Sequence, residues 1–209
     1  TRSFRRKLSL QVYPDLKIVV RAPLTYNSTD AILFLEKHQI WLEKTLTRLA
    51  AYPQKKEKII ATGEKYLYLG KPLTIDIVDG LKFNIAIDHD TLRITKTQKT
   101  KNLDKKIMLW EKAQLSIVIQ QLTEKWAIQM QAQHRMQEVR IKKMKSRWGS
   151  CNNRGVLTFN LDLIERREAV IEYIVIHELC HLFELNHSTR FYAILTKYCP
   201  QWRELKKAL

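Results

Sequence analysis

Alternating apolar and polar positions predict a β-hairpin near the start of the chain. Two alternating segments, residues 4–13 and 17–21, flank the turn signal Pro14-Asp15. A helical pattern follows, with N-cap candidates at residues 28–30 and an expected end before Pro53. The apolar positions of this single predicted helix are Ile32, Leu35, Ile40, Leu42, Leu46 and Leu49.

Short β-rich runs follow from residue 65 to residue 96. They read YLYLG, LTIDIV, FNIAID and TLRITK, and turn signals at residues 70–72, 79–80 and 89–90 separate them. We expect successive hairpin strands. A polar stretch without apolar periodicity, residues 96–105, then suggests a boundary. The pattern therefore predicts a β-rich region with one helix over residues 1–100 and a second domain over residues 101–209.

The second half is mainly helical. Apolar positions in residues 107–133 form a stripe long enough for a core-facing helix. Residues 139–150 and 156–164 flank the turn sequence CNNRG, which predicts a hairpin. Helices are expected at about 168–185 and 188–209, the last interrupted at Cys199-Pro200. The fold class is therefore α+β. The stripe consists of Ile107, Leu109, Trp110, Leu115, Val118, Ile119, Leu122, Trp126 and Met130.

Net charge and cysteine content bear on the partners and the cellular location of the protein. The formal net charge is +16, and residues 140–147 hold five basic side chains in eight. This charge could attract nucleic acid, or it could simply make a solvated basic surface. Three cysteines without C-x-x-C spacing argue against a disulfide framework and indicate a reducing, cytoplasmic location. The basic N-terminus alternates in polarity, so we expect neither a signal peptide nor a membrane span; its first residue is not Met, so the natural start is expected upstream.

One segment carries a recognisable metal-binding pattern. His181 lies one helical turn beyond His177 and about 40° from it, so both imidazoles can face one ion. Glu178 lies about 100° round the wheel, where a carboxylate can reach a metal-bound water. This is the H-E-x-x-H arrangement, in which two neutral imidazoles bind zinc and the glutamate is the general base. The alternative is a solvated or hydrogen-bonded histidine pair. The opposite face of the helix holds Val175, Ile176, Leu179, Leu182 and Phe183.

A catalytic zinc usually has three protein ligands, so a third is needed. Glu184 would be about 10 Å from His177 along a continuous helix, which suits a supporting or surface role. Cys180 adjoins the apolar face and is expected in the core. His187 can turn toward the ion only if the helix stops first. Asn186 tolerates the left-handed conformation that ends helices, and Ser188 is a good N-cap, so we expect a break at residues 185–186 and His187 as third ligand.

The second half resembles a known family. The segments KSRWGSC (145–151), LTFNLDLI, VIHELCHLFELNHSTRFY and CPQW are similar to the pattern of YgjP-like metallopeptidases. The resemblance implies a zincin-like fold, one zinc ion bound by His177, His181 and His187, and Glu178 as the catalytic residue. A more distant similarity is to SprT-like proteases, some of which act on DNA-bound proteins. Metzincins carry glycine where this chain has Glu184, which disfavours that class.

These observations give two alternative functions. The first is a zinc-dependent peptidase acting on peptides or unfolded proteins; the second is a basic nucleic-acid-associated protein with a structural zinc, or a protease for DNA-bound proteins. Arg190 and Tyr192 follow the third ligand and are candidates for oxyanion stabilisation, or surface and packing residues. Trp148 and Gly149 could lie on a strand that pairs with an extended substrate, or serve packing and a bulge.

Overall fold

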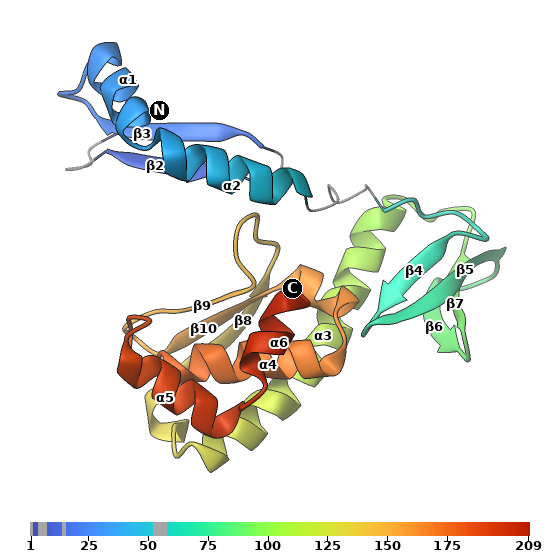
Figure 1. Ribbon diagram of the computed structural model, residues 1–209. Coiled ribbons are helices and arrows are strands. Elements are labelled where there is room, and N and C mark those ends of the chain that lie inside the picture. Colours follow the sequence, from blue (N-terminus) through green and yellow to red (C-terminus); the bar gives the residue numbers. More distant parts are fainter. Residues whose placement is uncertain (1, 4–7, 14–15, 52–57) are drawn as a thin grey trace. The chain divides into compact units, whose positions relative to one another are not determined.

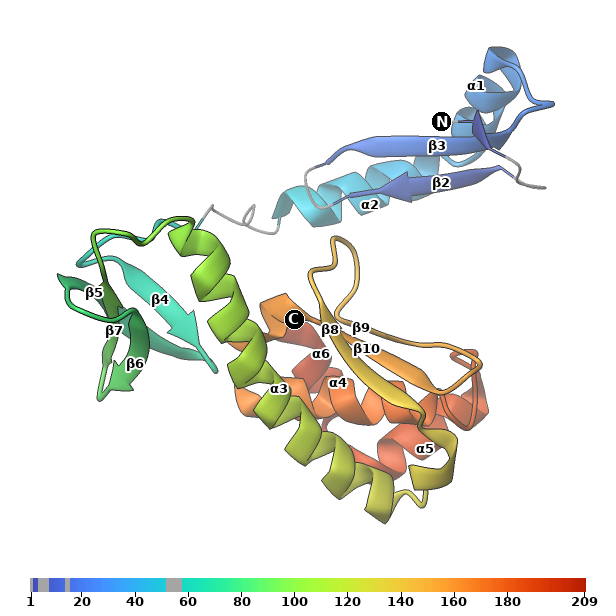
Figure 2. The same cartoon turned by 180° about the vertical axis from the view of Figure 1, so that it is seen from behind.

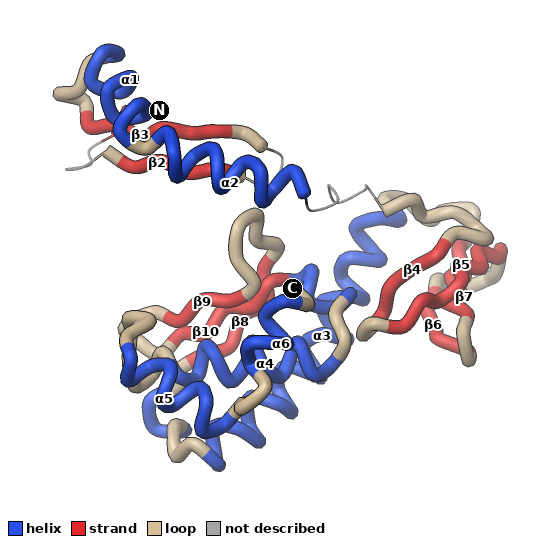
Figure 3. Tube along the Cα trace, viewed as in Figure 1, coloured by secondary structure: helices blue, strands red, loops and turns tan. Residues whose placement is uncertain are grey.

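In the computed structural model, groups of strands and groups of helices follow one another along the chain (Figure 1, Figure 3). The fold class is therefore α+β, as predicted. The structure describes residues 2–3, 8–13, 16–51 and 58–209. The chain divides into two compact units, residues 1–57 and 58–209. Each unit is described by itself.

The first unit holds a three-stranded sheet. Its strands are β1 (Arg2–Ser3), β2 (Ser9–Val12) and β3 (Ile18–Pro23), in the order β1-β3-β2. Strands β2 and β3 are antiparallel, with Leu10 opposite Val20, so the predicted hairpin is confirmed. The predicted turn at Pro14-Asp15 lies outside the described residues.

The predicted single helix of this unit is in fact two helices, α1 (Ser28–Lys37) and α2 (Gln39–Ala51). The break is at His38, whose imidazole Nδ1 lies 2.8 Å from the carbonyl oxygen of Phe34. The N-cap of α1 is Asn27, one residue before the predicted candidates. Asn27 and Asp30 form a reciprocal capping box, because each side chain accepts a hydrogen bond from the backbone N–H of the other residue.

The second unit begins with a four-stranded sheet in the order β4-β5-β7-β6. The expectation of successive hairpins holds for the outer pairs, but β5 and β7 are parallel, so the chain crosses over between β5 and β6. This pairing sets Ile75 beside Leu92 at the centre of the sheet, where both are buried. The register therefore puts the apolar face of both strands in the core. The strands are β4 (Lys65–Tyr68), β5 (Lys71–Asp79), β6 (Asn84–Asp88) and β7 (Thr91–Lys96).

Helix α3 (Leu103–Gln129) takes part in two hydrophobic clusters. Ile107, near its N-terminus, packs with the four-stranded sheet, whereas Leu115 and Ile119 pack with the rest of the unit. Most of the predicted stripe faces these clusters, but Leu109 is exposed. A boundary near residue 100, between β7 and α3, stays a prediction; both elements lie within the second unit.

A second, three-stranded sheet lies beside α3, in the order β8-β10-β9. Strands β9 (Gly149–Cys151) and β10 (Val156–Asn160) form the hairpin expected around CNNRG. The segment 139–150, predicted as one strand of the hairpin, in fact contributes to two strands: β8 (Glu138–Lys142), which pairs in parallel with β10, and β9, with a loop at residues 143–148 between them. The buried Asn160 holds this loop, since its side-chain amide donates to the carbonyls of Met144 and Arg147, both at 3.0 Å.

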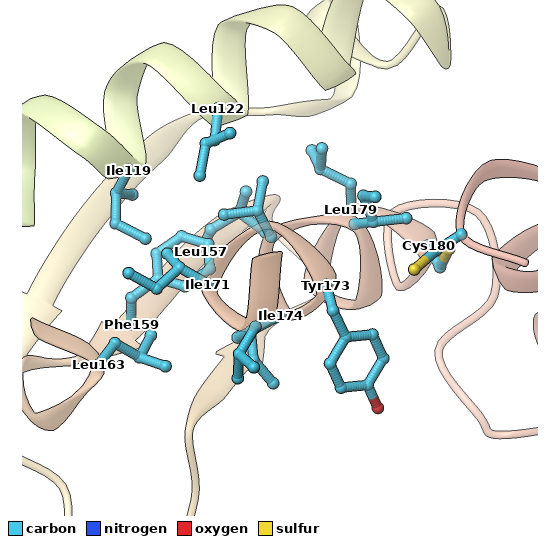
Figure 4. Packing of buried hydrophobic residues seen from close by; sticks show 14 of the residues in the cluster. Ile119, Leu122, Leu157, Phe159, Leu163, Ile171, Tyr173, Ile174, Leu179 and Cys180 are labelled. Carbon is cyan, nitrogen blue, oxygen red and sulfur yellow. The ribbon is translucent and has the colours of Figure 1, made fainter. Parts of the chain in front are cut away.

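Three helices complete the second unit: α4 (Glu168–Cys180), α5 (Thr189–Tyr198) and α6 (Trp202–Lys207). The predicted interruption at Cys199-Pro200 is confirmed between α5 and α6. Helix α4 contacts α3, α5, α6 and β9, so it is buried nearly all round and not only on one face (Figure 2). Figure 4 shows its core neighbours, among them Ile119 and Leu122 of α3. Across the described residues, every helix is too short or too polar to cross a membrane.

Candidate metal centre

The three predicted ligands converge at the C-terminal end of α4. His177 lies in the last turn of α4, His181 directly follows the helix, and His187 lies in the loop before α5. One ring nitrogen from each imidazole lies within 4.8 Å of the other two. The Nε2 atoms of His177 and His187 are 3.1 Å apart, close to the separation of about 3.3 Å expected for two tetrahedral zinc ligands.

The chain reaches this arrangement by a route that differs from the predicted one. The regular helix ends at Cys180, not near residue 185, and turns follow, in which the N–H of Glu184 donates to the carbonyl of Cys180 at 3.0 Å. Asn186 does not adopt the left-handed conformation, so the predicted break at that residue is wrong. The predicted N-cap is confirmed, because the Ser188 hydroxyl accepts a hydrogen bond from the N–H of Phe191.

Hydrogen bonding at the histidines fits a metal-binding role. The Nδ1 atom of His181 lies 3.0 Å from the carbonyl oxygen of Glu184, which favours a proton on Nδ1 and leaves Nε2 with a free lone pair. The buried Nδ1 of His177 has no hydrogen-bond partner among the described residues. Neutral nitrogens facing one another are unfavourable unless a proton or a cation lies between them, so this donor set fits a divalent ion such as zinc.

The electrostatic environment keeps the inner imidazoles neutral. Burial lowers the pKa of His177 to about 3, and the neighbouring His181 and His187 add to this effect. Burial likewise lowers the pKa of His181, although its hydrogen bond to Glu184 opposes the shift. Metal ligation requires the neutral form, so the fold presents both residues ready to bind.

An aromatic ring supports all three imidazoles. The Phe191 ring, on the first turn of α5, has its centroid 4.9 Å from that of His177, 4.6 Å from His181 and 4.7 Å from His187. Phe191 is fully buried. Sequence reasoning missed this residue, and the only available signal was its position four residues after the third histidine, just inside the predicted helix. Its packing fixes the rotamers on which metal geometry depends.

Glu178 packs against strand β9 at Gly149. Only 3% of it is exposed, and its Oε2 has no hydrogen-bond partner among the described residues. Burial raises the pKa of its carboxyl to about 8, partly opposed by the charge of Arg147. A Cβ atom at Gly149 would lie 2.7 Å from Cγ and 2.8 Å from Cδ of Glu178. The absence of a side chain at Gly149 therefore allows the Glu178 carboxyl to approach the strand closely. The sequence had suggested only a substrate contact or a bulge at this residue.

The other candidate residues have different surroundings. Trp148 packs against the core, and the Arg166 guanidinium lies 4.8 Å from its ring centre. Tyr192 stacks on His187 at 6.2 Å and on Trp202 at 5.1 Å. Arg190 is exposed, and within the described residues no contact joins its side chain to the histidines. Cys180 is fully buried in the core, as predicted. 

Comparison with known proteins decides the family. The family model for the YgjP-like metallopeptidase domain matches residues 6–209. The chain belongs to this family. The match includes the N-terminal half, for which the sequence showed only a general similarity. As a metallopeptidase-family protein, the chain is a peptidase of the hydrolase class whose family implies a metal ion.

Comparison with solved structures and curated proteins adds little. The crystal structure of the metallopeptidase zymogen of Pyrococcus abyssi abylysin is similar, with a TM-score of 0.40 and 26% sequence identity. The similarity covers 43% of this chain and 89% of that chain. No curated protein matches the chain.

Proposed function

We propose that this protein is a zinc-dependent metallopeptidase, with one zinc ion bound by His177, His181 and His187 and with Glu178 as the general base. The convergence of the three imidazole nitrogens within 4.8 Å carries this proposal. A set of three histidines leaves a fourth position for water, whereas structural zinc sites generally have four protein ligands. The exposure of His187 supports a fourth position that solvent can reach.

Zinc in such a site lowers the pKa of a bound water toward about 7 and polarises the substrate carbonyl. Glu178 accepts a proton from the attacking water, and it then passes this proton to the nitrogen of the leaving amine as the peptide bond breaks. Its Oε2 atom has no partner among the described residues, so a hydrogen bond to water would complete its environment. The close packing against Gly149 limits the positions that this carboxyl can take.

An extended substrate has an available strand partner. Strand β9 lies at the edge of its sheet and contacts α4, which carries Glu178. We propose that the substrate backbone pairs with this edge, next to Gly149. Tyr192 is the better supported of the two oxyanion candidates, because its ring stacks on His187, whereas no contact between Arg190 and the histidines is found among the described residues.

Peptides or unfolded proteins are the proposed partners. The alternative partner, nucleic acid, is not part of this proposal, because the basic segment 140–147 is partly neutralised. Arg140 pairs with Glu138, and Lys143 lies 2.8 Å from Asp162. A cytoplasmic location is proposed from the three cysteines, which are all free thiols.

The direct test replaces Glu178 by Gln. We expect Glu178→Gln to retain about one zinc ion per chain, measured by elemental analysis, because glutamine removes no ligand. Cleavage of a denatured protein should fall roughly 10²- to 10⁴-fold, because the proton acceptor is lost. Glu184→Gln is the matched control, since only the backbone carbonyl of Glu184 contacts a histidine. Unchanged activity in Glu178→Gln would remove Glu178 as the base.

A further inference from the structure

A cavity of about 620 Å³ opens beside His181. Three segments of the second unit form its walls: residues 135–137 before β8, the β9–β10 turn at 152–155, and the loop 181–185 that follows α4. One ligand of the proposed metal centre thus also lines a separate hollow. A peptide held at the centre would have this cavity within reach of its neighbouring residues.

Two arginines line the cavity, Arg135 and Arg154. The Arg135 guanidinium is positioned by a hydrogen bond from Nη1 to the carbonyl of Leu182, at 3.2 Å, and by the Phe183 ring, whose centre is 4.8 Å away. These contacts involve no carboxylate, so they leave its charge uncompensated. A positioned but unneutralised arginine is suited to bind a carboxylate, often through two parallel hydrogen bonds.

Arg154 lies in a turn that is held by hydrogen bonds. The side-chain oxygen of Asn152 accepts hydrogen bonds from the N–H groups of Arg154 and Val156, at 2.9 and 3.0 Å. A Cβ atom at Gly155 would overlap the carbonyl of Arg135, so the turn packs directly on the opposite wall. No contact of the Arg154 side chain is found among the described residues, and none of the residues that line the cavity is acidic. The cavity is therefore cationic without internal compensation.

We propose that this cavity is a subsite for a carboxylate group of the peptide substrate. Strand β9 runs from Gly149, beside Glu178, to Cys151, and its turn forms the cavity wall. A substrate extended along β9 advances about 3.3 Å per residue, so the carboxylate would lie about three residues from the scissile bond. This inference rests on the proposed peptidase function, and it adds a preference for acidic substrates.

Two sources could supply the carboxylate: an aspartate or glutamate side chain, or the C-terminus of the substrate. A set of internally quenched peptides of about ten residues separates them. Each peptide shares one alanine- and leucine-containing sequence, with a single Glu or Gln placed at successive positions, and each is made with a free or an amidated C-terminus. A preference for Glu over Gln indicates the side chain, and a preference for free acid over amide indicates the C-terminus.

The test measures both cleavage and binding for the zinc-loaded full chain. Binding is measured in the Glu178→Gln background, where peptides are not consumed. We expect Arg154→Glu to weaken binding of the preferred carboxylate peptide by about fivefold or more, and to leave its neutral counterpart unchanged. Lys99→Glu is the matched control, because it makes the same change in net charge at an exposed position that does not line the cavity. Arg135→Gln should reduce the same preference with zinc content unchanged.

The outcomes separate this inference from the proposed function. Equal binding of the carboxylate and neutral peptides by the unaltered cavity would overturn the subsite. So would an equal loss for both peptides in Arg154→Glu, or competition by a short oligonucleotide without any acid preference. Carboxylate-dependent binding without cleavage of any peptide by the wild-type chain would support the subsite and contradict the peptidase proposal.

Discussion

Two buried glutamates in the second unit have opposite surroundings. Glu111, on α3, is 7% exposed and Glu178, on α4, is 3% exposed. Oε1 of Glu111 accepts a hydrogen bond from the Tyr66 hydroxyl at 2.6 Å and from the Lys58 ammonium at 2.7 Å. Oε2 of Glu178 has no partner among the described residues. Both side chains are therefore buried. They differ in whether the carboxyl oxygens have hydrogen-bond partners.

The difference separates a structural role from a chemical one. Glu111 lies in a closed polar group, since Lys58 also lies 2.9 Å from Glu165 and connects the start of the unit to its core. The unpartnered Oε2 of Glu178 carries a desolvation cost that the charge of Arg147 offsets only in part. Such a cost is tolerated where a reacting molecule supplies the missing contact. In this unit the missing partner, and not burial alone, marks Glu178 as the candidate for chemistry.

The comparison of the two glutamates can be tested by mutation. We expect the largest effect on activity from Gly149→Ala. The new Cβ would lie 2.7 Å from Cγ of Glu178, well inside van der Waals contact, and would push the carboxyl away from β9. A displacement of about 1 Å can cost roughly 10²-fold in rate, so we expect that loss in kcat, with little change in KM or zinc content. Ser150→Ala, one residue along the strand, is the control.

A second measurement shows whether Gly149 acts through Glu178. In the Glu178→Gln background, Gly149→Ala should cause no further loss of the residual activity, because the group that it positions is already absent. Additive losses in the double variant, or a wild-type kcat in Gly149→Ala, would argue that the glycine does not position the base.

At the structural glutamate we expect a loss of stability without loss of chemistry. Glu111→Ala removes the hydrogen-bond acceptor of the Tyr66 hydroxyl and one of the two carboxylates that contact Lys58, so the free energy of unfolding should fall by about 1–3 kcal/mol. Urea denaturation measures this change, and kcat per folded molecule should stay unchanged. Glu124→Ala on the same helix, whose carboxylate contacts only the exposed Gln120, should change stability by less than about 0.5 kcal/mol. A large fall in kcat for Glu111→Ala would break the distinction.

The smallest effect is expected for the stability of Glu178→Gln. In the metal-free chain, its free energy of unfolding should lie within about 0.5 kcal/mol of the wild-type value or above it, because a neutral amide is less costly to bury than an unpartnered carboxyl. Urea denaturation after chelation measures it. A loss above about 1 kcal/mol would mean that Glu178 has a stabilising partner and resembles Glu111 after all.

Local patterns in the sequence predicted much of the fold. The spacing of apolar residues predicts helix α3. The turn sequence CNNRG, which contains asparagine and glycine, predicts the β9–β10 hairpin. The parallel pairing of β5 with β7 was not predictable in this way, because strand pairing between non-neighbouring segments depends on which apolar faces meet in the core. The loop at 143–148 was also missed, because it is held by the side chain of Asn160, far along the chain.

The candidate site divides in the same way. The convergence of His177 and His181 follows from helical geometry. The position of His187 beside the other two histidines was predicted for the wrong reason. The helix ends at Cys180, and the backbone of Asn186 does not adopt the left-handed conformation. The ring of Phe191 and the space at Gly149 are relations between distant segments, so no local pattern could identify them.

The support given by Phe191 also sets an order for assembly. Proteins are synthesised from the N-terminus, so His177, Glu178 and His181 are made before α5 (Thr189–Tyr198). Until α5 packs, the third histidine is unplaced and the ring beneath all three imidazoles is missing. A nascent chain therefore carries an incomplete, inactive centre. The chain can therefore cut polypeptides only after its own core has folded. An unfolded copy of the same core would be a potential substrate.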